Sequence, residues 1–479
     1  MKLSKGHFGV FVAGRWIDDG ELVEIHSPFD QSVVASVRRA TRTQLEEAIS
    51  AAVAAFEVTR KMASYERKRV LDRVAAELTT RHEEFAKTIC LEAGKPIKTA
   101  RAEVDRAIFT MQVAAEESTR IGGEVLPLDL QGFTAGRWSI VRRFPIGPIA
   151  AITPFNFPLN LVCHKLGPAI AAGCPIVLKP APQTPISSLM LAEVIHRAGW
   201  PKGALSVVYL ANEDAGPLIE DDRLKMLSFT GSAAVGWQLK SRSGKKKVAL
   251  ELGGNAGCIV HDDADVEQAA ARCAIGGFSY AGQSCISIQR VFVHENVFDR
   301  FLDALVSKAK GLKSGDPAEE STDVGPMIRE SDAIRAETWI REATAQGAKL
   351  LCGGRRNGSM LEPTVLTGTR DSQKVNCMEV FAPVVTVEKY HDFDEALHKV
   401  NDSTFGLQAG IFTRDAVRIF RAYEVLEVGG VIIGDVPTFR IDHMPYGGLK
   451  DSGLGREGLK YAIEEMTERK LMVIALGSH

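Results

Sequence analysis

The chain has 479 residues, more than one hydrophobic core usually holds, so two or three domains are expected. Its composition, 45% hydrophobic and 25% charged, is that of a globular protein, and a formal net charge of only −2 excludes an overall field that attracts nucleic acid or anionic membranes. No segment reaches the about 18 uninterrupted apolar residues of a membrane span, and the first residues lack the apolar core of a signal peptide.

The eight cysteines are scattered, and no two of them have C-x-x-C spacing. This pattern argues against a zinc site and against a disulfide framework. We therefore expect a cytoplasmic protein with reduced thiols and no bound metal.

Residues 41–120 are expected to be helical. Thr43 is positioned to cap the first helix, with Glu46 three residues on as in a capping box. The segment from Gly94 to Pro96 contains both helix-stopping residue types, so a helix should end there.

From residue 146 the pattern changes to apolar strands that alternate with helices. Strands are expected at 149–153, 175–180, 205–210 and 225–229, with a helix at 186–197. Such alternation predicts a parallel sheet covered on both faces, with ligands beyond the carboxyl ends of its strands. A second α/β region should span about 255–445, with helices that begin at Asp265 and near Val297.

One predicted strand end, residues 229–236, carries Gly231 and Ser232 at the start of a helix. Backbone N–H groups at such a helix start can hold a pyrophosphate. The segment is not the G-x-G-x-x-G fingerprint, and a plain strand–helix turn is the alternative.

Glu251, in the Glu-Leu-Gly-Gly segment 251–254, and Cys285 form the most informative pair in the chain. A thiol is the best side-chain nucleophile, and a carboxylate can take a proton from water. The pair indicates covalent catalysis in which Cys285 takes up an acyl group and Glu251-activated water releases it. The alternative for a cysteine considered alone is a buried, inert side chain.

Seven segments resemble the aldehyde dehydrogenase superfamily in order and spacing, along nearly the whole chain. They are residues 154–158 (Pro-Phe-Asn-Phe-Pro), 179–180 (Lys-Pro), 229–232 (Phe-Thr-Gly-Ser), 251–254, 282–285 (Gly-Gln-Ser-Cys), 379–383 (Glu-Val-Phe-Ala-Pro) and 445–453 (Pro-Tyr-Gly-Gly-Leu-Lys-Asp-Ser-Gly). The resemblance implies oxidation of an aldehyde to a carboxylic acid with NAD or NADP.

The resemblance assigns four catalytic roles. Cys285 attacks the aldehyde, and the Asn156 amide stabilises the resulting oxyanion. Glu251 activates the water that hydrolyses the thioester, and Glu457 lies in the proton path behind it. Without the motif, Asn156 would be a turn residue and Glu457 an exposed helix carboxylate.

The implied cofactor contacts lie in both halves of the chain. They are Lys179 at the adenosine ribose, Gly231 and Ser232 at the pyrophosphate, Glu379 at the nicotinamide ribose, and Phe381 and Phe155 near the nicotinamide. Pro182 occupies the position where NAD-specific members usually carry a Glu that binds the ribose 2′-hydroxyl. Proline offers no such acceptor and does not repel a 2′-phosphate, so NADP should be accepted.

Arg106 and Arg440 align with the walls of the family's substrate tunnel, as does Phe157. Guanidinium groups suit carboxylate, phosphate and sulfonate, so a small anionic aldehyde is predicted. The alternatives are local ion pairs of Arg106 with Glu103 and of Arg440 with Asp442. A broad-specificity enzyme for neutral aldehydes also remains open.

The expected fold is α/β: a Rossmann-like cofactor domain, an α/β catalytic domain and a small β oligomerisation element that makes a homodimer or homotetramer. The predicted boundaries are 1–123 and 143–252 for the NAD(P)-binding domain, 253–450 for the catalytic domain, and 124–142 and 451–479 for the oligomerisation element.

Three functions other than hydrolytic oxidation are possible for such a chain. A relative that transfers the acyl group to coenzyme A would tend to lack Glu251, and a silent structural relative would tend to lose Cys285. A cofactor-free cysteine hydrolase would need a histidine partner for the thiol, and no histidine lies in a motif that indicates one.

Overall fold

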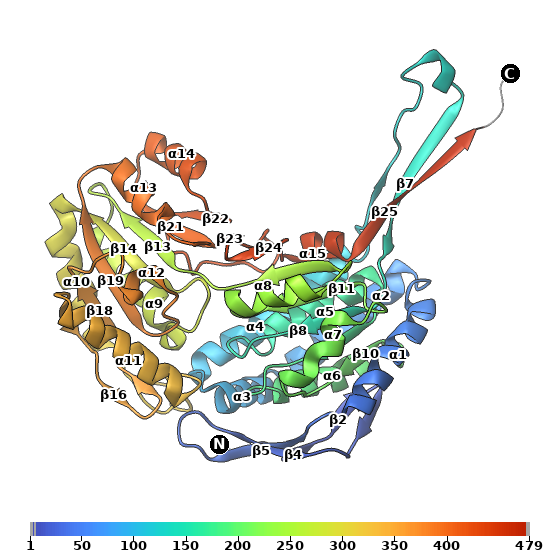
Figure 1. Ribbon diagram of the computed structural model, residues 1–479, viewed down its shortest axis with the longest axis horizontal. Helices are drawn as coiled ribbons and strands as arrows, with labels where there is room; N and C mark the ends of the chain where they lie inside the picture. Colours follow the sequence, from blue (N-terminus) through green and yellow to red (C-terminus); the bar gives the residue numbers. More distant parts are fainter. Residues whose placement is uncertain (1–2, 4–5, 476–479) are drawn as a thin grey trace.

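Two large β-sheets flanked by helices form two lobes, and a long β-arm extends away from them (Figure 1). The computed structural model describes residue 3 and residues 6–475. The α/β fold class predicted from the alternating strands and helices is confirmed.

The first lobe is built on an eight-stranded sheet in the order β24-β12-β11-β8-β9-β10-β2-β3. Its strands are β2 (Val10–Val12), β3 (Arg15–Ile17), β8 (Ile149–Ile152), β9 (Ile176–Lys179), β10 (Leu205–Val207), β11 (Met226–Thr230), β12 (Lys247–Glu251) and β24 (Gly453–Leu454). The five strands from β12 to β10 are mutually parallel, and antiparallel strands close both sides. All four strands predicted in this region are confirmed.

Helices cover both faces of this sheet. They are α1 (Arg42–Thr59), α2 (Ser64–Thr80), α3 (His82–Ala93), α4 (Ile97–Glu117), α5 (Asn160–Ala172), α6 (Ile186–Arg197), α7 (Gly216–Glu220), α8 (Ala233–Arg242) and α15 (Leu459–Glu465). Helix α6 has the predicted bounds, and α3 ends directly before Gly94 as predicted.

The predicted cap of α1 was wrong by two residues. Thr41 is the cap: its hydroxyl accepts from the Gln44 N–H at 3.2 Å, and the Gln44 side chain accepts from the Thr41 N–H at 2.9 Å. Gln44 thus completes the capping box that had been expected from Thr43 and Glu46, because glutamine reaches the cap N–H as well as glutamate does.

The second lobe is built on a seven-stranded sheet in the order β15-β18-β19-β14-β13-β21-β22, parallel except for β15. Its strands are β13 (Ala256–Val260), β14 (Ile288–His294), β15 (Lys349–Cys352), β18 (Thr364–Thr367), β19 (Val384–Tyr390), β21 (Gln408–Phe412) and β22 (Gly430–Ile433). Its helices are α9 (Val266–Phe278), α10 (Phe298–Gly311), α11 (Glu330–Ala345), α12 (Lys374–Cys377), α13 (Phe393–Asn401) and α14 (Ala416–Val425). Each residue of β13 is buried, as its apolar run requires.

The arm is a three-stranded sheet. Strand β25 (Thr467–Ala475) pairs antiparallel with β7 (Arg137–Pro145) over its whole length, and β6 (Gly123–Glu124) adds to the other side of β7. Residues 451–466 were predicted to belong with this element, but β24 pairs with β12 and α15 packs against α5, both in the first lobe.

Smaller sheets complete the chain. They are β1 (His7–Phe8), β5 (Val33–Arg38) and β4 (Leu22–His26); β16 (Arg356–Asn357) with β17 (Met360–Leu361); and β20 (Phe405–Gly406) with β23 (Leu449–Lys450). Among the described residues no helix has the length and apolar character needed to cross a membrane.

The functional cavity lies where the two lobes meet. Glu251 is the last residue of β12, so it stands at the carboxyl end of the first sheet. Cys285 comes three residues before β14, at the amino end of the second sheet. Opposite ends of two parallel sheets thus bring together residues 34 positions apart in the sequence.

Candidate active site

A cavity of about 690 Å³ between the lobes contains most of the predicted site residues. Its lining includes Phe155, Asn156, Lys179, Pro182, Gly231, Ser232, Glu251, Cys285, Glu379, Phe381, Arg440 and Glu457. Of the predicted site residues, Arg106 and Phe157 are not among the described residues that line it.

Cys285 follows a tightly constrained loop. Tyr280 and Ala281 adopt left-handed backbone conformations, with φ of 50° and 52°, and Gly282 follows with φ of 66°. A Cβ on Gly282 would lie 2.2 Å from the Ala382 carbonyl oxygen, so only glycine fits there. The loop therefore presents Cys285 in one defined position.

The Cys285 thiol is half-buried and lies 2.9 Å from the Tyr446 hydroxyl. Burial raises the pKa of the thiol to about 11, although the contact with Tyr446 and the charge of Arg440 act in the opposite direction. The surroundings alone therefore leave the thiol mostly protonated at neutral pH.

The Asn156 amide is held against the same loop. Its Nδ2 donates to the Gln283 carbonyl at 3.0 Å, and Lys95 Nζ donates to its backbone carbonyl at 2.7 Å. An amide nitrogen carries two hydrogens, so one is left for an oxygen bound beside Cys285. This orientation is compatible with the predicted role at the oxyanion.

Glu251 is buried, and its Oε2 has no hydrogen-bond partner among the described residues. Burial, with a smaller contribution from Glu457, raises the pKa of Glu251 well above its ordinary value. Gly447 makes room for this carboxylate, because a Cβ there would lie 3.0 Å from Glu251 Oε1 and 2.8 Å from the Gly455 carbonyl oxygen. Glu251 thus lines the cavity with a carboxyl oxygen that no described residue engages.

Glu457 is not the exposed helix carboxylate that the sequence left open, because it is only 6% exposed. It accepts from Arg440 Nη2 at 2.9 Å and lies 3.6 Å from Lys165 Nζ. Burial would raise the pKa of Glu457, but the charges of Lys165, His164 and Arg440 outweigh burial and lower it. The two carboxyl groups therefore have pKa values shifted in opposite directions.

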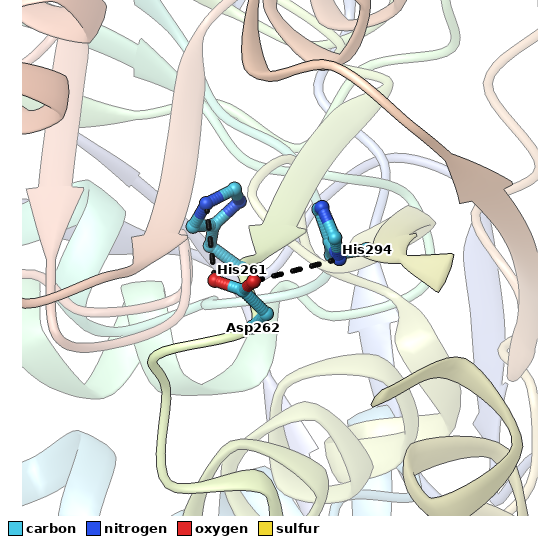
Figure 2. Close-up of side chains that lie close together, drawn as sticks. All are labelled: His261, Asp262 and His294. Carbon is cyan, nitrogen blue, oxygen red and sulfur yellow. Dashed lines mark ion pairs between the residues drawn. The ribbon is translucent and has the colours of Figure 1, made fainter. Parts of the chain in front are cut away.

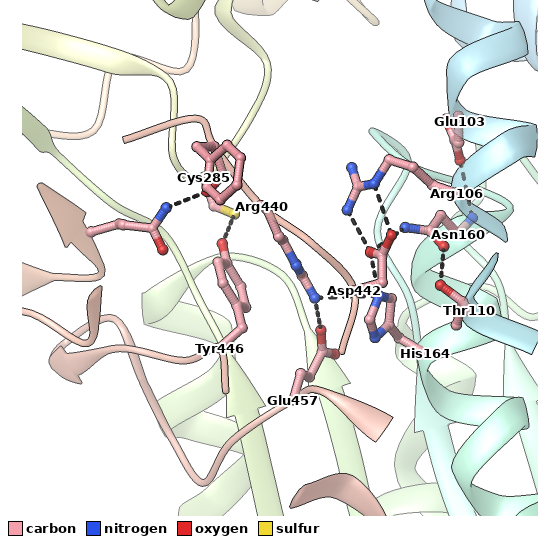
Figure 3. Close-up of polar contacts among 12 residues, drawn as sticks. Glu103, Arg106, Thr110, Asn160, His164, Cys285, Arg440, Asp442, Tyr446 and Glu457 are labelled. Atoms are coloured by element: carbon pink, nitrogen blue, oxygen red, sulfur yellow. Dashed lines mark hydrogen bonds and ion pairs between the residues drawn. The ribbon is translucent and has the colours of Figure 1, made fainter. Parts of the chain in front are cut away.

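Both predicted arginines have carboxylate partners, but not the local ones that were considered (Figure 3). Arg106 binds Asp442 through two N–H groups, at 2.6 and 3.1 Å, rather than Glu103. Arg440 pairs with Glu457 rather than Asp442. Both alternatives, the Arg106–Glu103 and the Arg440–Asp442 ion pair, were therefore wrong.

Asp442 is the centre of a buried polar network behind the cavity (Figure 3). Besides Arg106 it accepts from His164 Nε2 at 2.8 Å and from Asn160 Nδ2 at 3.1 Å. Burial would raise the pKa of Asp442, but these contacts outweigh it and hold that pKa well below its ordinary value. The network fixes the loop that carries both Arg440 and Asp442.

Sequence reasoning missed four members of the site: Tyr446, Lys165, His164 and Asp442. Tyr446 lies inside the matched segment 445–453, so its position was recognised but its hydroxyl was not. Lys165 and His164 lie on α5, which is buried along its whole length. Charged residues in an otherwise apolar helix were the available signal, since such groups are rarely buried without a partner.

The cofactor half of the cavity has groups that fit a nicotinamide dinucleotide. Lys179 Nζ donates to Asn212 Oδ1 at 2.9 Å, and burial lowers the pKa of Lys179 to about 8. Ser232 precedes α8, and its side chain makes no capping bond, so it is free to contact a phosphate group. Glu379 accepts from the Gly254 N–H at 2.9 Å, and burial raises its pKa to about 7.

The two phenylalanines expected near the nicotinamide contact each other. The rings of Phe155 and Phe381 meet edge to face, with centroids 6.0 Å apart. They come from opposite lobes, so the cavity wall at this point is apolar and shared by both.

A second polar cluster, His261, Asp262 and His294 (Figure 2), lies at the carboxyl ends of β13 and β14, two central strands of the second sheet. Its members follow β13 or end β14, whereas Cys285 precedes β14. His261 Nε2 is 3.2 Å from Asp262 Oδ1, and His294 Nδ1 is 3.9 Å from Asp262 Oδ2. Because the Asn296 N–H donates to His294 Nδ1 at 3.3 Å, that nitrogen is already engaged. The expectation of no bound metal stays a prediction.

The sequence profile of the aldehyde dehydrogenase family matches residues 16–472. The chain belongs to this aldehyde dehydrogenase family. It is an NAD(P)-dependent enzyme that oxidises an aldehyde to the acid, which confirms the function implied by the seven matched segments.

Individual relatives of this aldehyde dehydrogenase match over nearly the full length. A 3-sulfolactaldehyde dehydrogenase of Priestia aryabhattai is 46% identical over 470 residues, 98% of each chain. The crystal structure of aldehyde dehydrogenase 21 from Physcomitrella patens, in complex with the reaction product succinate, is 48% identical, covers 100% of both chains and superposes with a TM-score of 0.98. Glyceraldehyde-3-phosphate dehydrogenase GapN from Methanocaldococcus jannaschii, complexed with NADP, is 38% identical, covers 96% of this chain and 100% of its own, and has a TM-score of 0.92.

Proposed function

We propose that this dehydrogenase oxidises a short aldehyde that carries an anionic group. The observation that carries the proposal is the position of Arg440: it lines the same cavity as Cys285, and its buried Nε has no hydrogen-bond partner among the described residues. A buried N–H without a partner is rare in folded proteins, so a ligand is the natural acceptor. A carboxylate, phosphate or sulfonate matches a guanidinium in charge and geometry.

The relatives support the same substrate class. One is a 3-sulfolactaldehyde dehydrogenase, and the crystal structure of aldehyde dehydrogenase 21 holds the reaction product succinate. Sulfonate and carboxylate share the negative charge that Arg440 would bind. Arg106 lies 5.5 Å from the centroid of the Phe157 ring, but Asp442 neutralises it, so the proposal rests on Arg440.

In the proposed mechanism, the Cys285 sulfur attacks the aldehyde carbon, and the free hydrogen of the Asn156 amide binds the oxygen that becomes negative. When bound, the nicotinamide cofactor accepts the hydride from the resulting thiohemiacetal. Glu251 then takes a proton from water, which hydrolyses the thioester to the acid. Glu251 then returns its proton to water, on a path where Glu457, whose carboxylate is kept ionised by Lys165 and Arg440, is proposed to lie.

Glu251 also distinguishes the hydrolytic route from acyl transfer to coenzyme A. A buried carboxyl group with a free oxygen lines the cavity, so a water-activating group is present where the thioester would form. The hydrolytic route is therefore the one that we propose.

The substrate proposal is tested by replacing Arg440 with leucine. We expect KM for succinic semialdehyde to rise at least tenfold more than KM for propanal, since a hydrogen bond to a charged group contributes about 1.5–3 kcal/mol. Arg440→Lys serves as the control, because it keeps the positive charge. Equal changes for the two aldehydes would contradict an anionic substrate and favour a broad-specificity enzyme.

We infer that NADP is accepted as well as NAD. Pro182 lines the cavity near Lys179. It has no carboxylate that could accept from the ribose 2′-hydroxyl of NAD or repel the 2′-phosphate of NADP. A kcat/KM for NAD more than about a hundredfold above that for NADP would contradict this inference.

We also propose that the arm joins subunits into a homodimer or homotetramer. Strand β25 exposes apolar side chains, with Leu471, Met472 and Val473 each about half exposed, and Trp138 of β7 is 61% exposed. An exposed apolar ribbon with free strand edges is typical of a surface that pairs with another subunit. In the proposed division of the chain, residues 1–123 and 143–252 bind the cofactor and residues 253–450 carry the catalytic thiol. A cytoplasmic location stays a prediction from the cysteine pattern.

A further inference from the structure

The Tyr446 hydroxyl is in direct contact with the sulfur of Cys285, at 2.9 Å. Tyr446 is only 3% exposed, and its backbone is held in both directions by Glu457: the Tyr446 N–H donates to the Glu457 carbonyl at 3.0 Å, and the Glu457 N–H donates to the Tyr446 carbonyl at 2.6 Å. The position of the hydroxyl is therefore determined by the fold and not by a mobile side chain.

The chemistry of the two groups indicates which one donates. A thiol S–H is a weak donor, whereas a phenol O–H is a good one and a thiolate a good acceptor. Burial holds the pKa of Tyr446 well above its ordinary value, so the phenol keeps the proton that a donor needs. The hydrogen bond is then strongest when the sulfur is ionised.

Arg440 strengthens this donor. Its guanidinium carbon lies 3.6 Å from the centroid of the Tyr446 ring, which is a close cation–π contact. A cation over the ring face withdraws electron density and makes the phenol hydrogen more positive. The buried Arg440 cation therefore makes the Tyr446 hydroxyl a stronger hydrogen-bond donor to the sulfur atom.

We propose that Tyr446 is a catalytic residue that donates its phenol O–H to the sulfur of Cys285 and stabilises the thiolate, with Arg440 stacked on its ring to strengthen the bond. The inference rests on the proposed role of Cys285 as the nucleophile. The thiol loses its proton to water, and the electron pair left on sulfur forms the C–S bond while the carbonyl π electrons move to oxygen.

Two of the three charged groups near the thiol disfavour the thiolate, so a direct hydrogen-bond donor is useful there. Glu379 and Glu251 both raise the pKa of Cys285 in addition to burial, and Arg440 is the cation that opposes them. Tyr446 supplies the direct hydrogen bond. Once the C–S bond has formed, the sulfur no longer carries negative charge, so the donor should accelerate attack on the aldehyde. Thioester hydrolysis releases the same thiolate, so the donor also stabilises that leaving group.

The test measures the reactivity of Cys285 with iodoacetamide as a function of pH, by mass spectrometry of the peptide that contains it, in the full-length protein and in Tyr446→Phe. We expect alkylation of the variant at pH 8 to be about tenfold slower and its pH profile to shift to higher pH. Tyr423→Phe, at a 72% exposed position on α14, is the matched control and should leave the profile unchanged.

Two further measurements separate the outcomes. The burst of NADPH formation with aldehyde should slow in Tyr446→Phe by a similar factor, while KM for NADP stays the same. The effects of Arg440→Leu and Tyr446→Phe on alkylation should be less than additive in the double variant, since both act through one contact. An unchanged or faster alkylation of Tyr446→Phe, or an unchanged burst, would overturn the proposal. Full dehydrogenase activity in Cys285→Ser would instead overturn the proposed function.

Discussion

Arg440 Nη2 lies 2.9 Å from Glu457 Oε2, so the guanidinium expected to bind the substrate anion also neutralises the carboxylate expected to relay protons. The same guanidinium stacks on Tyr446, which contacts Cys285. One buried cation thus connects the substrate end, the nucleophile and the proton path. A substitution at any one of these positions should therefore affect the other two.

Replacing Glu251 with glutamine should separate the two halves of the reaction. Attack and hydride loss do not need this carboxylate, so a burst of about one NADPH per site should remain. Turnover after the burst should fall about 100- to 10,000-fold, which is typical of a lost general base. Stopped-flow absorbance at 340 nm measures both phases. Glu464→Gln, at a partly exposed position on α15, is the control, and a burst lost together with turnover would contradict the assignment.

The rate of thioester hydrolysis should rise with pH. Burial and Glu457 raise the pKa of Glu251, and only the ionised carboxylate accepts a proton from water, so the active fraction grows until pH exceeds the raised pKa. We expect the post-burst rate, measured from about pH 5 to pH 9, to follow one ionisation above the ordinary value for glutamate. In Glu251→Gln the residual rate should lose this ionisation, and a wild-type rate that decreases with pH would rule out Glu251 as the base.

Asp442→Asn should destabilise the protein. The aspartate neutralises the partly exposed Arg106 and accepts from the buried His164 and Asn160, so its loss leaves these donors poorly paired, at a cost of about 1–3 kcal/mol. Because the pKa of Asp442 is lowered in the folded state, its contribution is complete above the ordinary aspartate pKa and is lost as pH falls through the lowered value. Urea unfolding at pH 7 measures the change.

The matched control for Asp442 is Asp394→Asn, which removes the partner of Arg421 at an exposed ion pair. Its unfolding midpoint should not move, because exposed pairs contribute little. Equal shifts in the two variants would show that the Asp442 network is not a stabilising element.

Pro182→Glu should shift cofactor preference towards NAD. A carboxylate at this position accepts from the ribose 2′-hydroxyl of NAD and repels the 2′-phosphate of NADP. We expect the ratio of kcat/KM for NADP to that for NAD to fall at least tenfold, the equivalent of about 1.4 kcal/mol. Pro182→Ala controls for loss of the ring, and an unchanged ratio in the glutamate variant would place the 2′-phosphate elsewhere.

The sequence determined much of the fold and the core of the site. Strands and helices such as 186–197 follow from apolar periodicity and capping residues, which act between near neighbours in the chain. Cys285, Glu251 and Asn156 were recognised from short segments with characteristic spacing. These segments carry strong local signals because tight turns and helix starts admit few residue types.

Only the tertiary structure decided the partners of the charged residues. Arg106 binds Asp442, 336 positions away, and not Glu103 on its own helix, which pairs instead with Lys95. The Tyr446 hydroxyl meets Cys285 across 161 positions, and Lys165 meets Glu457 from a helix that is otherwise apolar. Such pairs depend on how the two lobes pack, and burial then makes each unpaired charge so costly that a distant partner displaces a local one.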